Sequence, residues 1–355
     1  MTTSEIAVPR AAERRRSALP RKLLSVAVSV VLTFFGLTVV TFMIGRVIPI
    51  DPVVAILGDR APPEAYERLR HQLYLDRPLI EQYVIYAGQV LRGDFGNSVI
   101  SAKPVVEDLE RVFPATLELS TTATLIGVLI GVPLGIFAAV NQGRLIDHVV
   151  RVVGLIGYSV PVFWLGLVGL LVFYVQLGWV GGPGRLDVFY DGVAPEVTGI
   201  VLVDAMLAGE WDVFWNGVQH LMLPASLLGY LSLAYIARMT RSLMLDQLRQ
   251  EYITAARVKG ASEARIIWRH ALGNVLVPLI TVIALSYASL LEGTILTETV
   301  FAWPGVGLYI TSSLFSADMN AVLGGTMLIG TVFIALNLLT DLLYQVVDPR
   351  ARDVR

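Results

Sequence analysis

Few side chains in this 355-residue sequence could carry out catalysis or hold a metal ion. The chain has no Cys, which excludes thiol chemistry and thiolate metal sites. None of its three Lys follows a Gly, although a phosphate-binding GxxxxGK loop requires that pair. The four His lie in segments that the topology derived below places on different sides of a membrane: His71, His148, His220 and His270. The sequence therefore predicts neither an ATPase nor a metal site.

The composition indicates a membrane protein. Hydrophobic residues make up 55% of the chain and charged residues only 16%, whereas soluble domains carry about 25% charged residues. The mean hydropathy of +0.67 is too high for a soluble body with one anchor. The 27 basic and 29 acidic residues leave no basic surplus for binding nucleic acid.

Six uncharged runs predict membrane-spanning helices, each of which needs about 20 apolar residues. They are residues 23–44, 119–140, a stretch within 152–180, 221–237, 271–291 and 321–340. The first run is too long for a signal peptide and predicts an uncleaved helix. Four prolines in or beside these runs predict kinks: Pro133, Pro161, Pro224 and Pro278. We therefore expect an all-α membrane protein with six transmembrane helices.

The distribution of Lys and Arg predicts that both termini are cytoplasmic. With that orientation, 18 of the 27 basic residues lie on inner segments, and the short outer loops hold only Arg185. The expected organisation is a cytoplasmic tail (1–22), a first helix (23–45), a long extracytoplasmic segment (46–114), a five-helix core (115–345) with a cytoplasmic loop (238–270), and a second cytoplasmic tail (346–355).

Acidic residues avoid the centres of the predicted spans. Glu118 and Glu292 lie near outer ends, and Glu298 lies just beyond one. An ion-driven transporter binds its coupling ion within the bilayer, where ionisable groups are costly and therefore mark such sites. These carboxylates are predicted either to contact substrate or to sit at the interface, within reach of water or a basic partner. Energy for uphill transport is expected to come from another protein.

The loop 238–270 carries seven basic and three acidic residues and predicts a docking element. Residues 251–259 are good helix formers, and Gly260 can adopt the left-handed conformation that ends a helix. Ser262 can cap a second helix, with Glu263 in its first turn. Small side chains at Ala255 and Ala256 allow another backbone to approach closely. An alternative is a basic loop that binds anionic lipid.

This loop resembles the EAA loop of ABC importer permeases. The matching residues are Glu251, Tyr252, Ala256, Arg257, Gly260 and Pro278. Eight further segments resemble the dipeptide, oligopeptide and nickel branch of that family in the same order, among them LDRPLIEQY (75–83), FPATLELS (113–120) and ETVFAWPGVG (298–307). Residues 183–218 match no family pattern.

The resemblance implies the type I ABC importer permease fold in a bacterial cytoplasmic (inner) membrane. It implies a second permease subunit as heterodimer partner, two ATPase subunits that bind ATP and Mg²⁺, and an extracytoplasmic substrate-binding protein. Di- or oligopeptides are the expected cargo. Nickel or another small amide-bearing ligand is the alternative within the family, and a secondary transporter or channel is the alternative outside it. Contact with the ATPase is implied for Glu251, Tyr252, Ala255, Ala256, Arg257 and Gly260.

Two further groups are candidates for the pathway and its outer gate. The pathway candidates are polar or aromatic residues of the predicted spans: Glu118, Tyr158, Trp164, Tyr287 and Glu292. The gate candidates follow the fifth span: Glu298, Trp303, Pro304 and Gly305. Helix packing is the competing explanation for the aromatic members of the pathway group.

Overall fold

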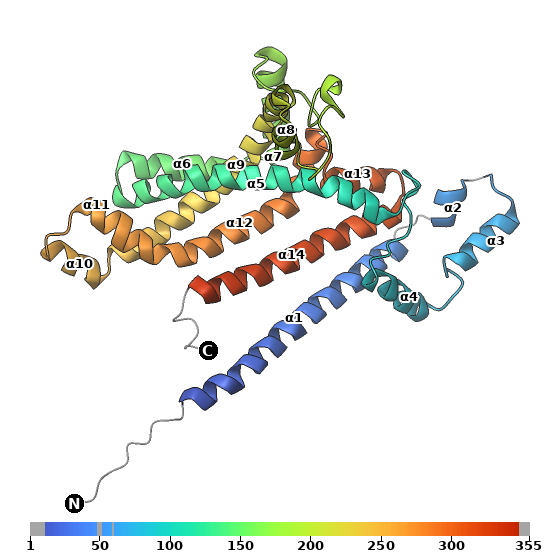
Figure 1. The fold of residues 1–355 in the computed structure, drawn as a ribbon, viewed down its shortest axis with the longest axis horizontal. Helices are drawn as coiled ribbons and strands as arrows, with labels where there is room; N and C mark the ends of the chain where they lie inside the picture. Colours follow the sequence, from blue (N-terminus) through green and yellow to red (C-terminus); the bar gives the residue numbers. More distant parts are fainter. Residues whose placement is uncertain (1–10, 48–51, 59, 348–355) are drawn as a thin grey trace, which may run out of the picture.

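The computed structural model describes residues 11–47, 52–58 and 60–347, and these residues form a helical protein with no β-strand (Figure 1). The helices are α1 (Ala11–Val47), α2 (Pro52–Leu57), α3 (Pro63–Gln72), α4 (Leu79–Leu91), α5 (Val105–Val140), α6 (Leu145–Ser159), α7 (Val162–Gly169), α8 (Val201–Ala208), α9 (Trp211–Leu248), α10 (Glu251–Val258), α11 (Glu263–Arg265), α12 (Leu272–Val300), α13 (Val306–Phe315) and α14 (Met319–Val347). Short π-helical segments, Leu170–Gln176 and Ile266–Ala271, extend α7 and precede α12.

Five helical stretches of the described chain are long and apolar enough to cross a membrane. They are Val26–Gly45, Val105–Val140, Trp211–Leu248, Glu263–Val300 and Met319–Thr340. A sixth span results if the bent pair Leu145–Gly157 and Val162–Gln176 is counted as one, as the sequence predicts. Several helices extend beyond the predicted apolar runs. The predicted run at 221–237 is the central part of α9, which has 38 residues. The backbone hydrogen bonds of this helix continue past the charged residues at which the uncharged run ends.

The bent pair turns by 95° between Gly157 and Val162. Pro161 is the N-cap residue of α7, in an extended conformation with φ −60° and ψ 130°. Because a proline has no N–H and disfavours helix in the residue before it, the ladder of α6 ends here. The kink predicted at Pro161 is therefore a complete break, whereas Pro133, Pro224 and Pro278 lie inside continuous helices.

Helices α5 and α9 pack with their backbones close together. Gly127, Gly131 and Gly135 repeat every fourth residue along the buried face of α5. A Cβ added at Gly131 would lie 3.1 Å from the carbonyl oxygen of Leu233, and one at Gly135 would lie 2.6 Å from that of Ala237. Small residues at this spacing allow close helix contact in membranes, where dispersion forces drive association.

Three buried clusters follow α5 from one end to the other. Val105 and Leu109 pack with Val306 of α13 and Ala321 of α14. Leu119 packs with Leu228 of α9 and with Trp303. Ile136 packs with Ile236 and Met244 of α9, and with Ile253 of α10. Helix α5 therefore connects the end of the molecule that carries α13 with the end that carries α10 (Figure 1).

Candidate functional site

Helix α10 presents most of its surface to solvent. Glu251, Tyr252 and Ala255 are exposed and Ala256 is half-buried, while Ile253 is fully buried in the cluster formed by α5, α9 and the start of α12. Only one side of this two-turn helix is needed to hold it, so the other side is available for contact with another protein. The helix predicted over 251–259 is confirmed, and it ends at Val258.

The break after α10 has the predicted geometry. Gly260 has φ +80°, and its N–H donates to the Arg257 carbonyl at 2.9 Å. Ser262 caps α11, since its hydroxyl accepts a hydrogen bond from the Arg265 N–H at 3.4 Å. Arg257 and Glu263 are paired across the break at 2.8 Å, and this hydrogen bond raises the pKa of the Arg257 guanidinium. The two short helices are thus held at a fixed angle.

Tyr252 links α10 to both neighbouring long helices. Its hydroxyl donates to Gln247 Oε1 of α9 at 2.9 Å and accepts from Asn274 Nδ2 of α12 at 3.0 Å. Together with the buried Ile253, these bonds couple any displacement of α10 to α9 and α12.

An ion pair that we did not predict from the sequence supports the same end of the bundle. Asp147, at the start of α6, is buried and receives two hydrogen bonds from Arg241 of α9, at 2.5 and 2.8 Å. The N–H of Gly143 donates to the same carboxylate at 2.9 Å. Paired Arg–carboxylate bonds fix orientation as well as distance. The turn between α5 and α6 is therefore fastened to α9.

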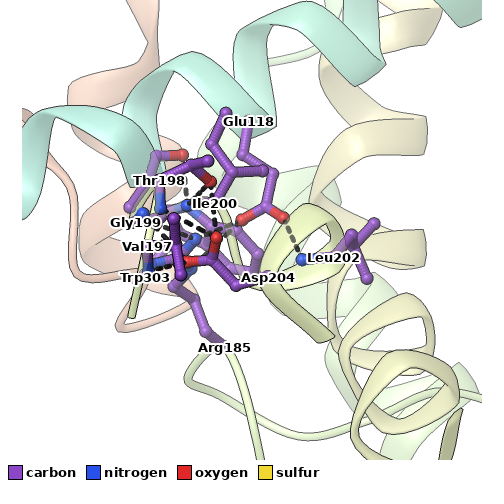
Figure 2. Close-up of polar contacts among 10 residues, drawn as sticks. Glu118, Arg185, Val197, Thr198, Gly199, Ile200, Leu202, Asp204 and Trp303 are labelled. Atoms are coloured by element: carbon purple, nitrogen blue, oxygen red, sulfur yellow. Dashed lines mark hydrogen bonds and ion pairs between the residues drawn. The ribbon is translucent and has the colours of Figure 1, made fainter. Parts of the chain in front are cut away.

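A second cluster, in the N-terminal half of α5, contains several of the gate and pathway candidates. Glu118 is buried and ion-paired with Arg185, whose Nε donates at 3.2 Å (Figure 2). The second carboxylate oxygen of Glu118 accepts from the N–H of Leu202 at 3.1 Å. The Arg185 guanidinium also donates to the Gly199 carbonyl at 2.9 Å and lies 5.7 Å from the centre of the Trp303 ring. Arg185 is thus a basic partner of the kind that the interfacial alternative for Glu118 expects.

These contacts fasten a segment that we call the cap, residues 181–208, over the N-terminal half of α5. Within the cap, Asp204 accepts hydrogen bonds from Thr198 N and Oγ1, both at 2.8 Å, and from Gly199 N at 2.9 Å (Figure 2). Burial alone would raise the pKa of Asp204, but these hydrogen bonds outweigh it and lower the pKa below 3.8. The charged form of the Asp204 carboxylate therefore holds the loop 197–199 in place.

The gate candidates form the turn that leads from α12 into α13. Glu298 is fully buried and accepts hydrogen bonds from Thr116 Oγ1 at 2.8 Å and from the N–H of Gly307 at 2.7 Å. The Trp303 indole donates to the Ala115 carbonyl at 2.8 Å. A Cβ at Gly305 would lie 2.5 Å from the Glu298 carboxylate, so only glycine fits there, and Pro304 is exposed beside it.

The structure brings Glu118, Glu298, Trp303 and Gly305 together near residues 115–118 of α5, whereas Tyr287, Glu292 and Trp164 take no part in these hydrogen bonds. Tyr287 shares a hydrogen bond with Thr121 of α5 at 3.2 Å. Glu292 is exposed on α12, and Trp164 is 51% exposed on α7. The side chain of Tyr158 lies outside the described residues. Glu292 is thus the pathway carboxylate that has no hydrogen bond or ion pair with the described residues.

Sequence reasoning missed the partners of these carboxylates. Arg185 carried one signal, because it is the only basic residue in the short outer loops of the predicted topology. Thr116, Arg241 and Asp204 carried none, since their roles depend on contacts between distant segments. Among the described residues no group of three or more His, Asp or Glu could hold a metal ion.

Comparisons with known proteins place the chain in a family. Residues 131–353 match the model for the binding-protein-dependent transport system inner membrane component, and residues 19–120 match the model for its N-terminal part. The di/tripeptide permease protein DppB of Pseudomonas aeruginosa is 44% identical over 91% of this chain and 96% of its own length. The probable D,D-dipeptide permease protein DdpB of Escherichia coli is 45% identical over 90% of this chain and 94% of its own length.

One similar solved structure is the inward-facing MetNI methionine ABC transporter, with a TM-score of 0.49 and 18% identity over 66% of this chain and 93% of that one. The two family models together cover most of the sequence, and the relatives match nearly end to end. The chain belongs to the family of binding-protein-dependent transport system inner membrane components.

Proposed function

We propose that this chain is a permease subunit of an ATP-driven importer of dipeptides and oligopeptides. It is a multi-pass inner-membrane protein, and relatives that share 43–45% of their residues with it are dipeptide transport permeases. The observation that carries the proposal is α10, a short exposed helix anchored by one buried residue at the end of the bundle. Such a helix can receive force from another protein and pass it to the spans.

The energy for import comes from partner subunits in this proposal. Two ATPase subunits bind ATP and Mg²⁺ and contact Glu251, Ala255, Ala256 and Gly260. A second permease completes the pathway as a heterodimer partner, and an extracytoplasmic binding protein delivers the peptide. Alternating access then requires that closure of the ATPases favours one arrangement of the spans over the other. The anchoring of α10 through Ile253 and Tyr252 supports this route for the coupling.

The test is a pull-down of the tagged chain from gently solubilised membranes. The double variant Glu251→Ala, Gly260→Val removes an exposed carboxylate and forces a β-branched residue into a left-handed position. We expect the parent chain to retain two ATPase subunits and a second permease, and the variant to lose the ATPases while keeping the permease. Uptake of a labelled dipeptide should fall with ATPase binding.

The matched control is Gly209→Val, Glu210→Ala at the other end of the molecule. Gly209 has φ +76°, and an added Cβ meets nothing within 4 Å, as at Gly260. The control therefore imposes the same backbone strain away from α10 and should keep the ATPases. Loss of the ATPases in both variants, or in neither, would contradict the proposed role of α10. A parent chain that is isolated without any ATPase would contradict the importer itself.

A further inference from the structure

Helix α4 carries three of its large apolar residues on its outer face, although Val90 is buried. Ile80, Val84 and Leu91 follow one another at helical spacing on a single face. Their exposed fractions are 80%, 63% and 74%. Glu81 lies at the edge of this face, within 3.7 Å of Arg77. A helix on the surface of a protein in water has the opposite arrangement, with polar side chains outward.

One polar residue of α4, Gln82, faces the protein, whereas Glu81 and Gln89 are exposed. Gln82 is only 7% exposed, and its amide donates to the Arg77 carbonyl at 2.7 Å. Gln82 and Gln89 line a cavity of about 180 Å³ between α1, α4 and the start of α14. A cavity of this size, with these amides in its otherwise largely apolar lining, has room for several water molecules. The polar side of α4 can therefore be hydrated from within, although its outer side is apolar.

Hydrogen bonds place α4 beside the membrane-spanning part of α1. The hydroxyl of Tyr83 lies 3.0 Å from Thr38 Oγ1, and that of Tyr86 lies 2.8 Å from Thr41 Oγ1. Both threonines belong to the apolar stretch that ends at Gly45. At 1.5 Å per residue, Thr41 lies about 6 Å and Thr38 about 10 Å from that end. Figure 1 shows α4 next to this end of α1.

The length of α4 excludes a span of its own. Its 13 residues extend about 20 Å, whereas crossing the hydrocarbon core takes about 30 Å. Short apolar helices at membrane depth lie in the interface, with the apolar face about 5–10 Å below the headgroups. That depth agrees with the positions of Thr38 and Thr41.

We propose that α4 lies in the membrane leaflet at the Gly45 end of α1, with Ile80, Val84 and Leu91 in contact with phospholipid acyl chains. A lipid surface satisfies the outward apolar face without a specific partner, and the half-buried Tyr83 and Tyr86 fix its depth against α1. Part of the segment 46–114, which the sequence predicts as extracytoplasmic, is then a membrane anchor. It restrains the long connection between α1 and α5.

The chain offers a direct test because it contains no Cys. Single variants Ile80→Cys, Val84→Cys and Leu91→Cys would each carry the only thiol of this chain for a nitroxide label. The variants are reconstituted, with the subunits that co-purify, into phosphatidylethanolamine and phosphatidylglycerol vesicles. Collisions of the label with oxygen, which is enriched in lipid, and with a water-soluble nickel chelate are measured. The parent chain, which has no Cys to carry the label, is treated in the same way and serves as the blank.

Two control positions calibrate depth. Glu67→Cys places the label on the exposed polar helix α3, and Val31→Cys places it within the apolar stretch of α1. We expect the oxygen-to-nickel collision ratio at Ile80 and Val84 to be severalfold higher than at Glu67 and to approach that at Val31. High nickel collision at these sites would show a face in water. Low collision with both reagents would show a face buried against another protein, and either result would overturn the proposal.

Discussion

Buried carboxylates at the end of the molecule that carries α13 accept hydrogen bonds from backbone N–H groups. Glu298 accepts the N–H of Gly307 at the start of α13, and Asp318 accepts the N–H of Val99 at 2.7 Å. Asp204 does the same for residues 197–199 within the cap. A buried N–H without an acceptor costs about 1–3 kcal/mol, so each carboxylate stabilises a segment that has no ladder of its own.

Glu298→Gln should therefore lower the thermal stability of the protein. The amide has one acceptor oxygen in place of two: if that oxygen keeps the N–H groups of Gly307 and Leu308, its NH₂ group replaces the oxygen that accepts the Thr116 hydroxyl, and loss of that hydrogen bond costs about 1 kcal/mol. The control is Glu292→Gln, six residues earlier on α12 and exposed. Thermal unfolding of the detergent-purified chains should show a lower midpoint for the first variant only. Equal midpoints would mean that Glu298 does not hold α13.

The ion pair between Glu118 and Arg185 should show strong coupling. Arg185→Met alone leaves a buried carboxylate without its cation, and breaking a buried pair in this way costs about 3 kcal/mol or more. Adding Glu118→Gln removes the uncompensated charge, so the double variant should be more stable than Arg185→Met. A double-mutant cycle of thermal stability measures this difference. Additive effects of the two substitutions would show that the pair does not fasten the cap.

Replacing a helical glycine by alanine should affect stability differently in different helices. On α5, Gly135 is packed against the backbone of α9, whereas Gly36 of α1 has nothing within 4 Å of an added Cβ. A glycine inside a helix costs about 1 kcal/mol relative to alanine because it loses more backbone freedom. A Gly→Ala change should therefore destabilise the protein where two helix backbones lie close together at that glycine. It should stabilise the protein where the helix only tolerates glycine.

Gly135→Ala is expected to destabilise the protein and Gly36→Ala to leave it unchanged or slightly more stable. The first methyl group would lie 2.6 Å from the Ala237 carbonyl and force α5 and α9 apart, while the second gains helix propensity without a contact. The yield of monodisperse protein in size-exclusion chromatography and its unfolding midpoint provide the measurement. A stable Gly135→Ala variant would be inconsistent with backbone contact between the two helices.

The hydrogen bonds that Asp204 accepts within the cap should persist between pH 7 and about pH 5. The folded-state pKa of Asp204 lies below its ordinary value of 3.8, so its stabilisation is complete above that value and is lost as the pH falls through the folded pKa. Hydrogen exchange of residues 197–200, corrected for the intrinsic rate, should show equal protection at pH 7 and at about pH 5. Asp204→Asn should lose that protection already at pH 7, whereas Asp212→Asn should keep it.

At the scale of the whole molecule, the sequence predicts what depends on local or averaged properties. The spans follow from hydropathy, and α10 with its glycine stop and Ser262 cap follows from signals within about a dozen residues. The cap does not follow, because Glu118 and Arg185 are 67 positions apart and only the folded chain brings them together. The reversed polarity of α4 also needs the structure, since a sequence pattern does not say which face is turned inward.

Helix α9 has a mechanical consequence for the transporter. Its 38 residues extend about 57 Å without a break, from the base of the cap to the start of α10. In the proposed importer, this helix would serve as a lever with one arm on each side of the membrane. A tilt of about 5° around its midpoint moves each end by about 2.5 Å in opposite directions, given a rise of 1.5 Å per residue. A small push on α10 would thus displace the far side of the bilayer to the extent that α9 stays straight at Pro224.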